Sequence, residues 1–177
     1  MLRPFTDVDR EPFYALNTHP QVVDSLGTSP SRAESDAMVE RYRAELECEG
    51  WGFWAVGVTG GAPFVGMVGL HRLPPWIPAA PAVEVGWRLH PDHWGHGYAT
   101  EAAGASLRFG FDEAGLEEIV SYTTTVNTRS QAVMARLGMV RDVDADFDHP
   151  QVPVGHPLRR HVLYRVTASQ VRPTVVP

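Results

Sequence analysis

The chain has 177 residues, a single cysteine and a formal net charge of −6, with acidic and basic residues interspersed. This length favours one domain with its own apolar core, which we expect over residues 1–167, followed by a loose tail at 168–177. The absence of a basic block argues against nucleic-acid binding, and no apolar run is long enough for a membrane-spanning helix. The lone Cys48 excludes an intramolecular disulfide and fits a reducing, cytoplasmic setting.

The first fifty residues predict a short strand followed by two helices. The strand, residues 2–5, starts at the very beginning of the chain, so we expect a short segment to precede this sequence. A first helix is expected over 6–17 and a second over 31–50, where Ser31 and Glu34 form a capping box. The N-terminus carries no apolar segment typical of a signal peptide.

Residues 51–58 and 64–73 are rich in β-forming residues and are separated by Thr-Gly-Gly-Ala-Pro, which predicts a β-hairpin. The proline-rich segment 73–81 is expected to be an exposed loop. Residues 81–91 alternate in the way that strand side chains alternate between two faces. One face carries Val83, Val85, Trp87 and Leu89, and the other carries Ala82, Glu84, Gly86 and Arg88.

The C-terminal half predicts two helices and three strands. A helix is expected over 98–112, a strand over 117–126, and a short helix over 127–138 with Asn127 as its N-cap and Gly138 at its end. Two further strands are expected over 140–148 and 159–167, and residues 149–158 form the loop that joins them. The order of elements predicts an α+β fold, in which about four helices flank one mixed, mostly antiparallel sheet of about seven strands.

Four aspartates alternate along the first of these last two strands: Asp142, Asp144, Asp146 and Asp148. They form either the solvated outer face of an amphipathic strand, which we favour, or an acidic lip that attracts a cationic amine.

Residues 90–102, His-Pro-Asp-His-Trp-Gly-His-Gly-Tyr-Ala-Thr-Glu-Ala, have three interpretations. In the first, His90, His93 and His96 are metal ligands, but a proline and two glycines interrupt the helix that would align them. In the second, the Gly-His-Gly between a strand and a helix is a dinucleotide motif, but Thr100 occupies the place of the third glycine.

The third interpretation, which we favour, is a binding site for a pyrophosphate group made of backbone. A strand ending at Leu89, a turn with Gly95 and Gly97, and a helix from Tyr98 would aim several N–H groups at one point. Glycine is needed because a side chain would block the close approach of an anion or forbid the required φ. We call residues 94–100 the phosphate cradle; it is expected to use no cationic side chain.

The segment Trp94–Ala99 resembles the acyl-CoA-binding motif of the GNAT acetyltransferases, commonly written (Q/R)xxGx(G/A). Residues 82–89 and 127–139 resemble the strand before this motif and the Asn…Ser…Leu-Gly-Met helix after it. In its details the chain is similar to the RimJ/RimL-like branch of N-acetyltransferases, which often carries tryptophan at the first motif position. The resemblance covers residues 1–167 and implies the GNAT fold, with a V-shaped split between the fourth and fifth strands.

The resemblance also implies a cofactor, acetyl-CoA, and a place for it. The cofactor would lie between strands 82–90 and 118–125, with its pantetheine arm along the first strand and its pyrophosphate in the cradle. The implied cofactor-binding residues are Trp87, Leu89, Trp94, Gly95, His96, Gly97, Tyr98, Ala99, Thr100 and Asn127. In this family the amine attacks the thioester directly, without an acyl-enzyme.

Two catalytic residues are predicted. Glu84 is the candidate general base, because a half-buried carboxylate beside apolar neighbours has a raised pKa; it could equally be an ordinary strand residue. Ser130 is the candidate donor to the departing sulfur, because the tyrosine that many GNAT members carry on this helix is absent; water could take its place. His149 and His161 are alternative bases.

The acceptor is expected to be a primary amine, on a peptide N-terminus or a small molecule, with no nucleic acid or membrane as partner. Trp76 and the segment 148–161 should rim its binding site, because long loops on rigid scaffolds carry specificity. The alternative function is a catalytically silent acyl-CoA-binding or sensor protein on the same fold. Homodimers are common in this family, although nothing in the residues themselves indicates one.

Overall fold

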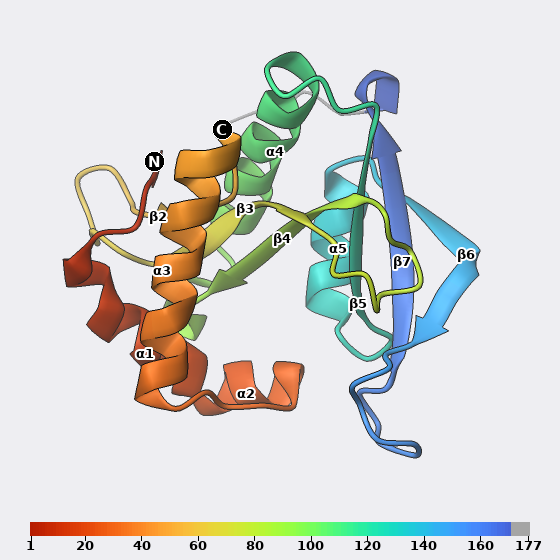
Figure 1. Cartoon of the computed structure of the whole chain (residues 1–177), viewed down its shortest axis with the longest axis horizontal. Coiled ribbons are helices and arrows are strands. Elements are labelled where there is room, and N and C mark those ends of the chain that lie inside the picture. Colours follow the sequence, from red (N-terminus) through yellow and green to blue (C-terminus); the bar gives the residue numbers. More distant parts are fainter. Residues whose placement is uncertain (171–177) are drawn as a thin grey trace.

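Seven strands form one open sheet in the order β1-β2-β3-β4-β5-β7-β6 (Figure 1). The computed structural model describes residues 1–170 of the chain. The strands are β1 Leu2–Arg3, β2 Phe53–Val56, β3 Gly66–Arg72, β4 Val83–Leu89, β5 Glu118–Thr124, β6 Val140–Asp148 and β7 Arg160–Thr167. All neighbours are antiparallel except β4 and β5, so the predicted α+β fold with a mixed, mostly antiparallel sheet is confirmed.

Five α-helices accompany the sheet in the described part, one more than predicted: α1 Arg10–Thr18, α2 Pro20–Leu26, α3 Arg32–Glu49, α4 Tyr98–Asp112 and α5 Thr128–Arg136. The additional helix is α2. It starts with Pro20, whose fixed φ suits a first helical position, and His19 Nδ1 accepts a hydrogen bond from the N–H of Gln21 at 3.3 Å. This seven-residue helix is too short to show an apolar period, which is why the sequence did not predict it.

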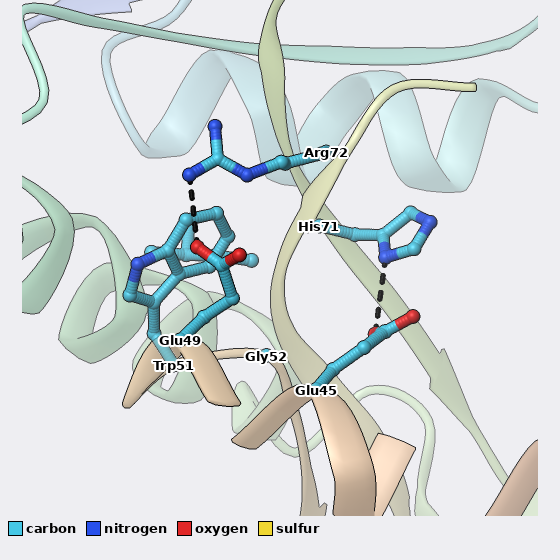
Figure 2. A pocket seen from close by; sticks show the side chains of 7 residues that line it. Glu45, Glu49, Trp51, Gly52, His71 and Arg72 are labelled. Atoms are coloured by element: carbon cyan, nitrogen blue, oxygen red, sulfur yellow. Dashed lines mark hydrogen bonds and ion pairs between the residues drawn. The ribbon is translucent and has the colours of Figure 1, made fainter. Parts of the chain in front are cut away.

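The helices cover both faces of the sheet (Figure 1). Helices α1 to α3 cover one face over a core that includes Phe13, Tyr42 and Phe53, whereas α4 and α5 cover the other over Leu107 and Leu137. Helix α3 is also held to β3 by a hydrogen bond between Glu45 and His71 Nδ1 at 3.2 Å and by an ion pair between Glu49 and Arg72 at 2.9 Å (Figure 2).

The predicted alternation along β4 is confirmed. The side chains of Val83, Val85 and Leu89 belong to the core under α4. On the opposite face, Phe53 lies against Gly86, and the Arg88 guanidinium donates to the side-chain oxygen of Asn17 in α1. Glu84 and Arg88 therefore point to the side of the sheet that α1 to α3 cover.

Strands β4 and β5 barely pair. Seven residue pairs join β3 to β4, but only Glu84 with Val120 joins β4 to β5. Both strands continue in the same direction beyond this pair but do not pair again, so they separate toward their C-terminal ends. This is the predicted split between the fourth and fifth strands, and Figure 1 shows the two strands diverging.

Strand β6 departs from the predicted alternation. A bulge lies between Asp142 and Phe147, so Val143 is 65% exposed although it was expected to face inward. Three of the four aspartates are paired with arginines: Asp142 with Arg165, Asp146 with Arg141, and Asp148 with Arg159 and Arg160. These carboxylates are mostly neutralised by neighbours.

The proline-rich segment between β3 and β4 was predicted to be an exposed loop, but part of it is buried. Trp76 is 51% exposed, but Ile77 is only 2% exposed and packs with Leu73, Val120, Phe147 and Leu163. The segment thus covers the β5–β7–β6 half of the sheet on the face of α1 to α3. Its prolines prevent regular structure without preventing burial.

None of the helices in residues 1–170 is long and apolar enough to cross a membrane. The first three residues of the predicted loose tail, Ala168–Gln170, form a short 3-10 turn. The rest of that tail lies outside the described residues.

Replacing Ile77 by alanine is expected to lower the free energy of unfolding by about 2–4 kcal/mol, because it leaves a cavity in this cluster. The matched control is Trp76→Ala, whose exposed ring should contribute less than about 0.5 kcal/mol. Urea denaturation of both variants measures the difference. Equal effects of the two substitutions would contradict the buried role of Ile77.

Candidate active site

The phosphate cradle lies at the open end of the split, directly after β4. Gly95 and Gly97 both have φ of 81°, and a β-carbon at either position would meet no protein atom within 4 Å. Glycine is therefore required by the left-handed backbone and leaves open space in front of it. Helix α4 starts at Tyr98, and its first backbone bond runs from Glu101 N–H to the Gly97 carbonyl at 3.0 Å. The N–H groups before Glu101 lie at the positive end of the helix.

Trp94 anchors the cradle to both walls of the split. Its indole Nε1 donates to the carbonyl of Leu89 at 2.8 Å, which fixes the loop against the end of β4. The guanidinium of Arg129, in the first turn of α5, lies 4.6 Å from the centre of the Trp94 ring. Arg129 was missed by the sequence analysis, although it lies between the predicted Asn127 and Ser130. A cation therefore lies beside the cradle, and the expectation that the cradle uses no cationic side chain stays a prediction.

The three histidines of this loop do not converge. The rings of His90 and His93 are 6.3 Å apart, and His96 stacks on Tyr98 instead, at 5.6 Å. In the described part of the chain, no group of three or more histidine, cysteine or acidic residues is arranged to hold a metal ion. The histidines make aromatic contacts around the cradle.

The edge of β4 that faces β5 presents unpaired backbone. The N–H of His90, just after β4, donates to the carbonyl of Val65, just before β3. Every second residue of β4 before His90 therefore directs its backbone N–H and C=O groups to β3. The residues between them direct theirs toward β5. Beyond the single pair of Glu84 with Val120, Trp87 has no strand partner on this side, and the Leu89 carbonyl accepts from Trp94 Nε1. An extended ligand could add to this edge as a further strand.

Glu84 lies where the split begins. Its carboxyl group is half-buried, and it has no hydrogen bond or ion pair within residues 1–170. Burial raises the pKa of Glu84 to about 7. His71 is opposite Glu84 on β3, but its Nδ1 is engaged with Glu45 and its ring stacks on Phe53 at 5.5 Å. A carboxyl group with this pKa can exchange a proton near neutral pH.

An aromatic cluster lies next to Glu84 on the β5–β7 side. The ring of Tyr122 is 5.7 Å from that of His161 and 6.5 Å from that of His149. Burial raises the pKa of Tyr122, and the charge of Glu84 raises it further. Burial also lowers the pKa of both histidines, so they are neutral at pH 7 and can accept a proton. The structure thus brings both alternative bases to the same face as Glu84.

Asn127 and Ser130 lie on the opposite wall of the split. Asn127 is the N-cap of α5, as predicted, because its Oδ1 accepts a hydrogen bond from the N–H of Ser130 at 3.1 Å. Ser130 is half-buried in the first turn of the helix. No hydrogen bond joins Ser130 to Glu84, so any cooperation between them would act through a ligand held between the walls.

A small pocket between α3 and β3 is separate from this site. Figure 2 shows Arg72 and His71 directed toward Glu49 and Glu45, with Arg72 also 5.1 Å from the ring of Trp51. The charged groups of the pocket therefore neutralise one another. They have a structural role in attaching α3 to the sheet.

A split sheet with an anion-binding turn after its central strand is the architecture of acyl-CoA-dependent transferases of the GNAT fold. Residues 1–140 match the family described as Acetyltransferase (GNAT) domain. The chain is 30% identical over 177 residues to FsC-acetyl coenzyme A-N(2)-transacetylase of Aspergillus fumigatus, an alignment that covers 96% of this chain and 74% of the relative.

Solved structures agree with this match. An acetyltransferase from Agrobacterium tumefaciens has a TM-score of 0.74 at 26% identity and covers 93% of this chain and 88% of its own. Spermidine N-acetyltransferase from Vibrio cholerae, solved with CoA and spermine, shares the fold with a TM-score of 0.74 at 16% identity, over 96% of each chain. The chain belongs to the GNAT acetyltransferase family, whose cofactor is acetyl-CoA.

The raised pKa of Glu84 predicts a pH-dependent loss of stability. Because the folded-state pKa of about 7 lies above the ordinary 4.5, the unfolding free energy falls as the pH rises through this interval. Glu84→Gln should therefore stabilise the protein by about 3 kcal/mol at pH 8 and change little at pH 4. Denaturant titrations at both pH values test this. An effect of the same size at both would contradict the assigned pKa.

Proposed function

We propose that this chain is an acetyl-CoA-dependent N-acetyltransferase of the RimJ/RimL-like branch, in which a primary amine attacks the thioester directly. The observation that carries the proposal is Glu84, an unpaired, half-buried carboxyl group with a pKa of about 7. It lies where β4 and β5 part, on the strand that leads to the phosphate cradle. A proton acceptor and an anion site are thus placed at the two ends of one open strand edge.

The residues present fit the cofactor. Acetyl-CoA supplies an activated acetyl group as a thioester. The N–H groups from Gly95 to Thr100 would hold its pyrophosphate, assisted by the charge of Arg129. The open backbone of Trp87 and Leu89 would pair with the pantetheine arm, and Asn127 would contact it from the other wall. An N–H of β4 would also stabilise negative charge on the thioester oxygen.

The chemistry needs two proton movements. The carboxylate of Glu84 removes a proton from the acceptor ammonium, directly or through a water, and the free amine then forms the new N–C bond as the C–S bond breaks. As the amide forms, the nitrogen gives up its second proton, which would reach the departing sulfur through Ser130 or a water; the proton on Glu84 is later released to solvent. His149 and His161 are the alternative bases, because both are neutral and lie beside Tyr122 on the same face.

The acceptor is an amine on a peptide N-terminus or a small molecule. The N(2)-transacetylase named among the relatives supports an amine nitrogen as the acceptor atom. The end of α2 and the β6–β7 loop meet over the Glu84 face, where a β-carbon on Gly27 would be 3.1 Å from Leu158. With the segment around Trp76, they would rim the acceptor site. We place the enzyme in the cytoplasm, consistent with a free Cys48.

Release of the CoA thiol in the presence of peptide and small-molecule amines tests the proposal. Turnover should rise with pH through about 7 as Glu84 ionises, and Glu84→Gln should lower kcat by about 10²- to 10⁴-fold. Glu47→Gln, on the exposed surface of α3, is the matched control. An unchanged rate and pH profile in Glu84→Gln would remove Glu84 as the base. Tight binding of acetyl-CoA without turnover on any amine would favour the silent acyl-CoA-binding alternative.

Gly97→Val should abolish acetyl-CoA binding, because a side chain there forces a strained φ and projects into the space in front of the cradle. Gly60→Val is its matched control: Gly60 also has a positive φ, 72°, with no atom near its β-carbon position, but it lies in the β2–β3 turn. Both variants should lose about 1–2 kcal/mol of stability. Calorimetry with acetyl-CoA should show binding by Gly60→Val alone. Binding by Gly97→Val with unchanged affinity would refute the cradle.

A further inference from the structure

Arg88 is a half-buried cation that no carboxylate neutralises within residues 1–170. The guanidinium donates to the side-chain oxygen of Asn17 and interacts electrostatically with the phenol group of Tyr42. Burial lowers the pKa of Arg88, which reflects the free energy of holding its charge away from water. Because a guanidinium has five N–H donors, most of its hydrogen-bonding capacity is unused.

Thr124 has a buried hydroxyl group without a hydrogen-bond partner. Its hydroxyl oxygen is the only buried side-chain nitrogen or oxygen in the described chain that lacks a hydrogen-bond partner. Thr124 is 5% exposed, and its register partner on β7 is His161. A buried hydroxyl without a partner is destabilising, and it invites a ligand that completes its hydrogen bonding.

The register places these two groups across the split from each other. Glu84 pairs with Val120, so four residues further along each strand Arg88 corresponds to Thr124. Paired residues and every second residue after them share one face, so Glu84, Arg88 and Thr124 all belong to the face under α1 to α3. The strands have separated there, so Arg88 and Thr124 lie on the same face of two different walls. The guanidinium has Asn17 as its side-chain partner, and the hydroxyl has none.

Arg88 is also kept apart from Glu84. At about 3.3 Å per residue, their α-carbons are about 13 Å apart along β4. The ring of Phe53 lies between them, because its Cε1 and Cζ come within 3.1 Å of where a β-carbon of Gly86 would be. The acid and the cation therefore cannot neutralise each other and are available to different groups of one ligand.

We propose that Arg88, with Thr124, binds a carboxylate of the acceptor, so that the substrate is an amine that also carries a carboxylate several atoms away. The planar fork of a guanidinium matches a carboxylate in a bidentate geometry, and the hydroxyl adds a third donor. This inference rests on the proposed function, because it places the acceptor amine at Glu84. Two sources have this chemistry: a free ω-amino acid, and a peptide whose first residue is acidic.

Matched acceptor pairs test the proposal. We would compare ω-amino acids of increasing length with their amides, and peptides that begin with glutamate with those that begin with glutamine. The wild-type protein should prefer the carboxylate member of at least one pair by about 10- to 100-fold in kcat/KM. Arg88→Met should reduce this preference to about twofold or less, and Thr124→Val should reduce it about threefold to tenfold. Arg43→Met, on the outer surface of α3, should leave the preference unchanged.

Affinity for CoA separates this inference from a cofactor role. Calorimetry should give the same CoA dissociation constant for wild type and Arg88→Met; a parallel loss of CoA affinity would assign Arg88 to the cofactor and overturn the proposal. Equal use of both members of every pair by the wild type would also overturn it.

If no amine is acetylated, the proposed function fails, and the carboxylate site is then tested by binding alone. The same pairs are titrated into the CoA-saturated wild type and Arg88→Met. Tighter binding of a carboxylate member, lost in the variant, would support the site; equal binding would refute it.

Discussion

The single parallel contact between β4 and β5 is the constraint on which the rest of the site depends. Glu84 and Val120 pair, and the strands then part, although each continues for several residues. This one contact fixes the depth of the split and leaves the edge of β4 open beyond it. The two halves of the sheet are joined otherwise by the core under α4 and α5, and by the contact of Arg129 with Trp94 at the mouth.

In the proposed binding mode, the acidic chain would hold the pyrophosphate of the cofactor by local geometry rather than by net charge. With a net charge of −6, no broad positive field draws a phosphate to the surface. Two glycines in the left-handed conformation and the start of α4 concentrate N–H groups in one place, and Arg129 adds a charge beside them. The net negative charge would not prevent binding, because backbone N–H groups act on an anion at short range, whereas the effect of distant carboxylates is screened by salt.

Packing on the face under α1 to α3 keeps reactive groups unpaired. Phe53, Gly69 and Gly86 are in register across three strands, and the missing side chain of Gly86 leaves room for the Phe53 ring over the sheet. The ring separates Glu84 from Arg88. The Nδ1 atom of His71 is hydrogen-bonded to Glu45 and is therefore not available to Glu84. A carboxyl group and a guanidinium that could have formed an ordinary ion pair thus stay desolvated and separate. Burying charged groups without a partner lowers the free energy of unfolding, and such destabilising arrangements are typical of functional sites.

The sequence by itself determined the strand and helix order, the alternation of β4, and the glycine turn before α4, because these depend on short-range periodicity and on φ values that only glycine accepts readily. Only the tertiary structure decided the short helix α2, the burial of Ile77, the bulge in β6 and the position of Arg129. It also decided which polar groups are buried without a charge partner: the pKa of Glu84, and the shared face of Arg88 and Thr124, follow from strand register and from neighbours distant in the chain. Spacing along a chain cannot reveal these, because desolvation and pairing are set by what packs against a residue.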